Sequence, residues 1–226
     1  MSAYVIDLGP FRLTQRLGKG AMGEVWSASH ADVGLPLAIK MITRSRSATT
    51  RFDAAFRNEA RAMAGMEHPG IARVFDFGEV DANTARDTGG LVSAGTLYLV
   101  MERLGTRLES TDFEGDWPRL RGALFDLLDA LAHAHARGLV HRDLKPDNTL
   151  WSLDGRQVKL TDFGVAHATE SLPRLKAAHD LGRKRATLEW ELAGEVDVAG
   201  TPNYMAPELV KAQVHAQGPW SDLYSL

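Results

Sequence analysis

The chain has 226 residues, of which 44% are hydrophobic and 24% charged, a composition typical of a folded globular protein. Its formal net charge of −3 gives no electrostatic reason to expect nucleic acid as a partner. The absence of cysteine excludes disulfides, thiolate nucleophiles and zinc–thiolate sites. No apolar run reaches the roughly 18 residues that a membrane helix needs, and no leader peptide is recognisable, so we expect a cytoplasmic chain without a membrane segment.

The first hundred residues alternate short apolar segments with glycines and turn residues. The pattern predicts three antiparallel strands within residues 11–42, a helix over 52–66, and two further strands at 71–77 and 96–102. The segment 81–95, rich in Gly, Thr, Ala and Asp, is expected to be an exposed loop. We therefore expect residues 11–103 to form a five-stranded antiparallel sheet with one helix, after a lead-in at 1–10.

Beyond residue 103 the periodicity becomes helical. Residues 117–138 place leucines on one helix face and end at a glycine. These leucines are Leu120, Leu124, Leu127, Leu128 and Leu131. Residues 104–226 are therefore expected to form a mainly helical second lobe, and the whole chain an α+β fold of two lobes.

A glycine-rich stretch, GKGAMGEV, begins at Gly18 and has the spacing G-x-G-x-x-G-x-V. Glycines at this spacing let backbone amides approach phosphates closely. A dinucleotide fold would need a helix directly after the third glycine, but residues 24–28 have the pattern of a strand, and no G-K-[ST] motif is present. The stretch predicts a hairpin that covers a nucleotide, with a glycine-rich hairpin that binds no ligand as the alternative.

Lys40 ends the apolar strand segment LAIK and could neutralise phosphate charge if a carboxylate held it in place. Glu59 on the following helix is the expected partner. Asp53 and Glu67 are the other acids near in sequence.

The most specific motif is His141-Arg142-Asp143-Leu144-Lys145-Pro146-Asp147-Asn148, which is followed by Asp162-Phe163-Gly164 and by GTPNYMAPE. With these motifs the chain resembles the eukaryotic-like (Hanks-type) serine/threonine protein kinases, and the segments GAMGEVW and GTPNYMAPE resemble their bacterial branch. The resemblance extends from Phe11 to Leu226.

The resemblance implies a site for ATP and Mg²⁺, or Mn²⁺ in its place. Asp143 would accept the proton of the substrate hydroxyl, Lys145 would lie beside the transferred phosphoryl group, and Lys40 and Glu59 would form an ion pair. Asn148 and Asp162 would hold the metal. The implied nucleotide-binding residues are Leu17, Gly18, Lys19, Gly20, Ala21, Met22, Gly23, Glu24, Val25, Ala38, Lys40, Met101, Glu102, Leu104 and Leu150.

The resemblance also implies regulation and protein partners. A stack of four residues would link the lobes: Met63, Val74, His141 and Phe163. Asp222 would hold the catalytic loop, which is the motif at residues 141–148. A phosphorylated residue between Asp162 and Glu208 would pair with Arg142, and the candidates for autophosphorylation are Thr187, Thr169 and Ser171. Thr201 would contact Asp143. The partners would be proteins that offer Ser or Thr hydroxyls.

Two alternatives to an active protein kinase remain. In the family the helix that begins near Trp220 is longer and more helices follow it, so we expect an incomplete second lobe with little kinase activity, and a catalytically silent nucleotide-binding or interaction fragment is the main alternative. A small-molecule kinase such as an aminoglycoside phosphotransferase is disfavoured by Lys145 and by GTPNYMAPE.

Overall fold

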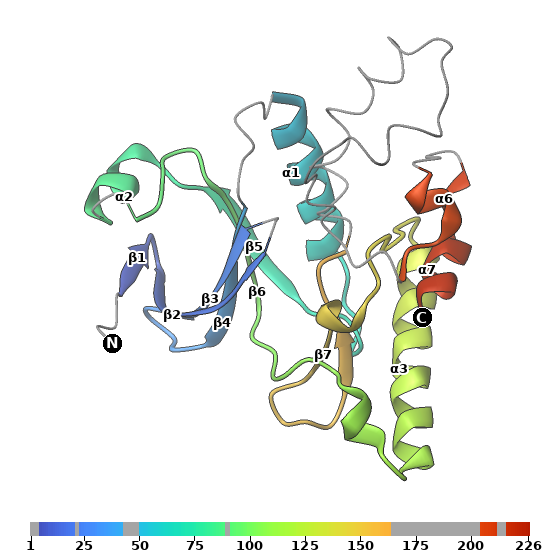
Figure 1. The fold of residues 1–226 in the computed structure, drawn as a ribbon. Helices are drawn as coiled ribbons and strands as arrows, with labels where there is room; N and C mark the ends of the chain where they lie inside the picture. Colours follow the sequence, from blue (N-terminus) through green and yellow to red (C-terminus); the bar gives the residue numbers. More distant parts are fainter. Residues whose placement is uncertain (1–4, 21–22, 43–49, 89–90, 164–203, 212–215) are drawn as a thin grey trace, which may run out of the picture.

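The structure is a computed structural model that describes residues 5–20, 23–42, 50–88, 91–163, 204–211 and 216–226. Two lobes are visible in Figure 1, one built on an antiparallel sheet with helix α1 and the other on the long helix α3. This arrangement confirms the expected α+β fold of two lobes.

A six-stranded sheet forms the first lobe, in the order β1-β2-β3-β4-β6-β5 with all neighbours antiparallel. Its strands are β1 (Ile6–Leu8), β2 (Phe11–Gly20), β3 (Gly23–His30), β4 (Pro36–Ile42), β5 (Val74–Glu79) and β6 (Leu97–Glu102). The sheet thus contains the five expected strands and one more.

The additional strand, β1, lies in the segment that was expected to be a lead-in. It pairs Ile6 with Leu13 and Leu8 with Phe11. Ile6 and Leu8 are each only 3% exposed, so the strand contributes to the core. Three residues are too few to establish an alternating pattern, which is why the sequence did not reveal it.

The two faces of the sheet bury different partners. Alternate residues of β4 belong to separate hydrophobic clusters, Ala38 and Ile42 to one and Leu37, Ile39 and Met41 to the other. The helix α1 (Thr50–Ala64) packs on the first face through Phe56, Ala60 and Met63, all at most 4% exposed.

The second face is covered by residues that were expected to form a loop. A short helix, α2 (Ala82–Asp87), lies there, and the Asp81 carboxylate caps it by accepting hydrogen bonds from the backbone N–H groups of Asn83 (2.7 Å) and Thr84 (2.9 Å). Val80 and Ala85 from this segment pack into the second cluster. The expectation of a loop over all of 81–95 was therefore wrong.

The second lobe is built around α3 (Trp117–His135), capped by the Asp116 carboxylate and followed by Gly138 at φ 75°. Its buried stripe consists of Ala123, Leu127, Ala130, Leu131 and Ala134, whereas Leu128 of the expected leucine face is 39% exposed. The remaining elements are η1 (Ser110–Phe113), η2 (Pro146–Asn148), β7 (Thr149–Trp151), β8 (Val158–Leu160), α6 (Pro207–Val210) and α7 (Pro219–Ser225).

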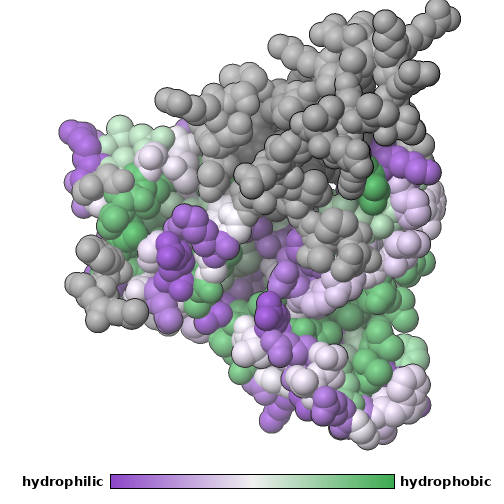
Figure 2. Space-filling view, in the orientation of Figure 1, coloured by the Kyte–Doolittle hydropathy of each residue, from purple (hydrophilic) through white to green (hydrophobic). Residues whose placement is uncertain are grey.

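Surface character differs between the cleft and the helical lobe. Figure 2 shows hydrophilic side chains around the hollow between the lobes and hydrophobic surface on the side where α3 lies. Two large apolar side chains of α3, Phe125 and Leu128, are exposed, with exposed fractions of 63% and 39%. Among the described residues, no helix has the length and apolar character needed to cross a membrane.

Candidate active site

A cleft of about 760 Å³ lies between the lobes and gathers most of the predicted site residues. Residues from the glycine-rich hairpin, the strand β4, the hinge after β6 and the catalytic loop line it together. The predicted residues found there are Leu17, Gly18, Lys19, Gly20, Gly23, Val25, Ala38, Lys40, Met101, Glu102, Leu104, Asp143, Lys145, Asn148, Leu150 and Asp162.

Four predicted residues are not in this lining. Ala21 and Met22 lie outside the described residues. Glu24 instead forms ion pairs with Arg16 (3.2 Å) and Lys19 (3.4 Å) along the hairpin. Glu59, on α1, does not line the cleft either.

The glycine-rich hairpin is the turn between β2 and β3. Gly18 pairs with Val25 and Gly20 with Gly23, and Gly23 has φ 140°, a value that side chains rarely allow. A Cβ atom added at Gly18 or Gly20 would meet nothing within 4 Å. These two glycines therefore leave open space over the cleft, as a loop that covers phosphates requires.

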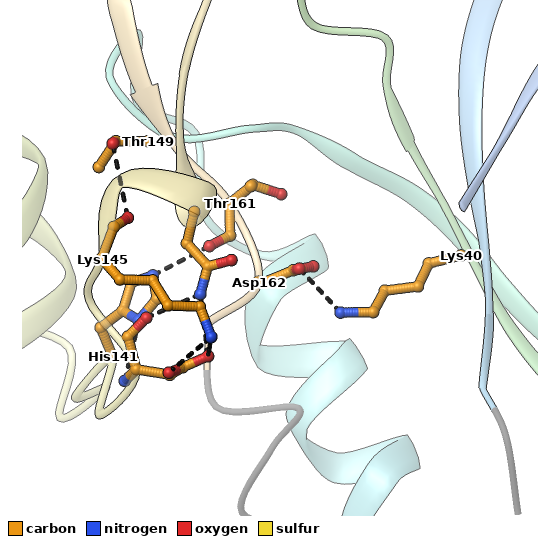
Figure 3. Close-up of polar contacts among 8 residues, drawn as sticks. Lys40, His141, Lys145, Thr149, Thr161 and Asp162 are labelled. Carbon is orange, nitrogen blue, oxygen red and sulfur yellow. Dashed lines mark hydrogen bonds and ion pairs between the residues drawn. The ribbon is translucent and has the colours of Figure 1, made fainter. Parts of the chain in front are cut away.

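Two side chains of the catalytic loop contact the Asp143 carboxylate. Lys145 Nζ lies 2.8 Å from Asp143 Oδ2, and Asn148 Nδ2 donates hydrogen bonds to the backbone oxygen (2.7 Å) and to Oδ2 (3.0 Å) of Asp143. Figure 3 shows these contacts beside the Lys40–Asp162 pair. The lysine and the amide fix the orientation of the Asp143 carboxylate in the cleft.

Asp222 of α7 anchors this loop from behind. Its carboxylate is completely buried and accepts hydrogen bonds from the backbone N–H groups of His141 (2.8 Å) and Arg142 (2.7 Å) and from His135 Nε2 (2.7 Å). These bonds hold Arg142 at φ 65°, an uncommon conformation for a residue with a side chain. The prediction that Asp222 holds the catalytic loop is confirmed.

His141 has a packing role. Its ring is completely buried, lies 4.5 Å from the Phe163 ring between centroids, and donates a hydrogen bond from Nε2 to the backbone oxygen of Thr161 (2.9 Å). Burial lowers the pKa of His141, although Asp222 and the Thr161 bond act in the opposite direction. A neutral imidazole therefore joins the catalytic loop to the strand end that carries Asp162. Its ring partner Phe163 belongs to the same buried cluster as Met63 and Val74.

Lys40 differs from the expectation in its partner. Its Nζ atom lies 2.8 Å from Asp162 Oδ2, and the side chain is 6% exposed. Among the residues that the structure describes, no ion pair joins Lys40 to Glu59. Burial raises the pKa of Glu59 to about 7, while the positive charge of Arg142 lowers it in part. In this structure Lys40 therefore neutralises Asp162, and burial favours the protonated form of the Glu59 carboxyl.

The hinge, residues 102–104 at the end of β6, connects the lobes and lines the cleft. Both oxygens of the Glu102 carboxylate are bonded to Lys159 Nζ, at 2.7 and 2.8 Å, so this side chain is not free to contact a ligand. Arg103 Nη1 donates a hydrogen bond to the backbone oxygen of Leu104. Met101 is 6% exposed and receives the Thr161 hydroxyl at its sulfur (3.7 Å).

The oxygen donors suit a hard divalent cation bound together with phosphates. Asp162 offers a carboxylate and Asn148 an amide oxygen to the same cleft, which are ligands that Mg²⁺ accepts. Within the described ranges no cluster of three or more His, Asp or Glu side chains could hold a metal ion by itself. The donor set therefore fits a metal whose remaining ligands are phosphate oxygens and water.

Several cleft residues were not predicted from the sequence. They are Arg103, Gly105, Arg107, Asp147 and Thr161. Asp147 is part of the catalytic-loop motif, and its position next to Asn148 could have identified it. Arg107 has no such signal, because an isolated arginine in a polar segment is usually a surface residue.

Three features together are typical of the protein kinase class: a glycine-rich hairpin over a cleft, a buried lysine on a strand, and a loop between two lobes that carries carboxylates. The family model described as "Protein kinase domain" matches residues 11–226. The chain belongs to the protein kinase family.

Several relatives are bacterial serine/threonine kinases. The chain is 39% identical to serine/threonine-protein kinase PknA of Mycobacterium tuberculosis (strain ATCC 25618 / H37Rv) over 96% of its own length and 45% of that protein. It is 34% identical to serine/threonine-protein kinase pkn2 of Myxococcus xanthus over 99% of its length and 24% of the relative. The resemblance to bacterial Hanks-type kinases is confirmed, and the chain spans less than half the length of these two relatives.

A solved structure supports the fold. The kinase domain of Mycobacterium tuberculosis PknI superposes with a TM-score of 0.64 at 23–24% identity, covering the whole of this chain and 74% of the solved one. At this identity the likeness concerns the fold alone.

Proposed function

We propose that the chain is a protein serine/threonine kinase domain with a signalling role, which transfers the γ-phosphoryl group of ATP to Ser or Thr hydroxyls of proteins. The observation that carries this proposal is the convergence of Lys40, Asp143, Lys145, Asn148 and Asp162 on one cleft. The residue ranges 11–103 and 104–226 would be its two lobes.

In the proposed mechanism the Asp143 carboxylate accepts a hydrogen bond from the substrate hydroxyl and receives its proton as the oxygen attacks the γ-phosphorus. The bond from the γ-phosphorus to the oxygen that bridges it to the β-phosphorus breaks, and ADP leaves. Lys145 lies against that carboxylate and would stabilise the charge that develops on the transferred group. The backbone of the hairpin at Gly18 and Gly20 would cover the phosphates. Positioning and electrostatics would thus supply most of the catalysis.

Asn148 and Asp162 would hold Mg²⁺, or Mn²⁺, which when bound neutralises phosphate charge. Asp162 needs its carboxylate for that task, whereas here the carboxylate is paired with Lys40. With Asp162 holding the metal, Lys40 would be free to pair with the α- and β-phosphates and with Glu59. Deprotonation of Glu59 would accompany that exchange, because only the carboxylate attracts the lysine.

Regulation and location belong to the same proposal. The Arg142 Nε atom is buried and, among the described residues, has no hydrogen-bond partner, which supports a role in binding a phosphorylated residue. Thr169, Ser171, Thr187 and Thr201 lie outside the described residues. The dependence on ATP supports a cytoplasmic location.

One observation favours the alternative of a catalytically silent nucleotide-binding or interaction fragment. Lys40 is paired with Asp162 and not with Glu59, so the ion pair expected for catalysis is not formed. Nucleotide binding at the hairpin would not require that pair. The experiment below distinguishes the two functions.

Purified chain is incubated with labelled ATP, Mg²⁺ and a mixture of Ser- and Thr-containing peptides, and its melting temperature is measured with and without Mg²⁺–ATP. An active kinase shows transfer that Asp143→Asn reduces by about 10²- to 10⁴-fold, and a melting-temperature increase that Asp162→Ala removes. A thermal shift without transfer would identify the silent alternative. The absence of both would contradict the kinase and the nucleotide-binding fragment, and would leave only the interaction fragment.

A further inference from the structure

Arg107 and Asp147 line the cleft, and together with Glu109, which pairs with Arg107, they form a network of charged side chains that we call the mouth triad. Arg107 Nη1 donates a hydrogen bond to Asp147 Oδ1 (3.1 Å), and Arg107 Nε donates to Glu109 Oε1 (3.2 Å). The three side chains are 61%, 56% and 57% exposed, so a molecule at the mouth can reach them. One guanidinium therefore pairs with two carboxylates whose side chains remain exposed.

Backbone contacts fix both sides of this triad. Arg107 forms an isolated bridge with Leu150, and the neighbouring Leu108 N–H donates to the Thr149 oxygen (2.8 Å). Asp147 lies in η2 beside Asn148, whose amide donates to the backbone oxygen of Asp143 (2.7 Å). The position of the triad relative to the Asp143 carboxylate is therefore determined by the backbone.

Arg107 and Asp147 line the same cleft as Asp143 and Lys145. A peptide that presents its hydroxyl to Asp143 has to lie at this mouth, so the side chains that flank the hydroxyl come near Asp147. Two unpaired carboxylates there would attract a flanking lysine or arginine. With Arg107 present, one of the two negative charges is cancelled and one oxygen of each carboxylate is already engaged.

The guanidinium keeps its charge over the whole working pH range. Its hydrogen bonds to Glu109 and Asp147 raise the pKa of Arg107 further above its already high value. The masking of the two carboxylates therefore does not depend on pH near neutrality.

We propose that Arg107 is a specificity-determining residue, which suppresses a preference for basic residues beside the phosphorylated Ser or Thr by masking Asp147 and Glu109. This inference rests on the proposed function and names the substrate class that the site disfavours, peptides rich in Lys and Arg. Specificity of this kind arises because the disfavoured peptide binds more weakly, and not because the favoured peptide binds more tightly.

The test is an arginine scan. A neutral peptide with one serine and its variants with a single arginine at each flanking position are assayed, and kcat/KM for each is divided by that of the neutral parent. The wild-type chain should show a nearly flat profile. Arg107→Ala should raise the ratio about three- to tenfold at one or two positions, and high salt should diminish the gain because the carboxylates are exposed.

Two further variants serve as controls. The double variant Arg107→Ala/Asp147→Asn should lose the acquired preference, because the carboxylate that attracts the arginine is removed. Arg156→Ala breaks another exposed Arg–Asp pair, with Asp154 at 3.9 Å, outside the cleft lining, and should leave the profile flat. A wild-type profile that already favours arginine as strongly as Arg107→Ala would overturn the proposal.

Binding separates failure of this inference from failure of the kinase assignment. Fluorescence anisotropy of the same peptides, with Ala in place of the Ser, reports affinity whether or not phosphoryl transfer occurs. If no peptide is phosphorylated, the proposed function fails, while tighter binding of arginine peptides by Arg107→Ala still supports the inference. Equal affinity of the two proteins for every arginine peptide would refute it.

Discussion

At the scale of single residues, Glu59 gives the clearest link between charge and stability. Burial raises its pKa from 4.5 to about 7, so the folded state favours the protonated carboxyl. Stability from this group is complete below about pH 4.5 and is lost as the pH rises through 7. The free energy of unfolding of Glu59→Gln should therefore be about 2–3 kcal/mol higher than that of the wild type near pH 8, so the variant is the more stable protein there. The two free energies should be equal near pH 4.5.

Urea denaturation at a series of pH values measures this difference, and Glu67→Gln is the matched control. Glu67 is an exposed acid whose side chain pairs with Arg73 at 2.8 Å, so its replacement should change stability little. The gain for Glu59→Gln should come with a loss of phosphoryl transfer if Glu59 holds Lys40 in the active state. A Gln variant that keeps the wild-type pH dependence would show that another group causes it.

At the scale of elements, α7 holds the catalytic loop through one carboxylate. Asp222→Ala would leave His135 Nε2 and the backbone N–H groups of His141 and Arg142 without their acceptor in a buried site. The expected loss of unfolding free energy is about 3–5 kcal/mol, measured by urea denaturation. Asp222→Asn retains one oxygen acceptor and should lose less.

If Asp222→Ala were no less stable than Asp222→Asn, these hydrogen bonds would not determine the stability of the loop. Activity gives a second measure, because Arg142 at φ 65° depends on the same carboxylate. Both variants should lower kcat more than they raise KM for ATP, since the hairpin and hinge remain intact.

Elements with a repeated pattern could be predicted from the sequence, and elements without one could not. The strands β2 to β6 and the helices α1 and α3 each show an alternating or helical period, so they could be predicted from the sequence. The strand β1 and the helix α2 are too short for a period, and α2 depends on a single cap, Asp81. Both become visible only when Ile6, Leu8 and Val80 are found in one cluster.

The site shows the same division. Contiguous motifs located Asp143, Lys145, Asn148 and Asp162 because their spacing is local. The partner of Lys40 is decided by how the lobes are placed, and Arg107 meets Asp147 across 40 residues of sequence. Neither contact leaves a local pattern, so both required the structure.

At the scale of the whole molecule, the lobes are joined by the loop between α1 and β5 as well as by the hinge. The Gly70 oxygen accepts from the Leu160 N–H (2.8 Å), and His68 Nε2 lies 3.1 Å from Asp129 Oδ2 on α3. A Cβ atom at Gly70 would lie 3.0 Å from the backbone oxygen of Asp126 and 3.1 Å from the Ala130 Cβ. The lobes therefore approach closely at a position that only glycine fits without strain.

Gly70→Ala should force this loop away from α3 and lower the free energy of unfolding by about 1–3 kcal/mol, because the nearest atoms are a helix backbone oxygen and an alanine Cβ, which cannot rotate aside. The matched control is Gly122→Ala on α3, where an added Cβ meets nothing within 4 Å. That substitution should raise stability by about 0.5–1 kcal/mol, since alanine favours a helix. Urea denaturation of both variants should therefore give shifts of opposite sign. A shift of the same sign and size for both would mean that the contact at Gly70 does not limit how closely the lobes pack.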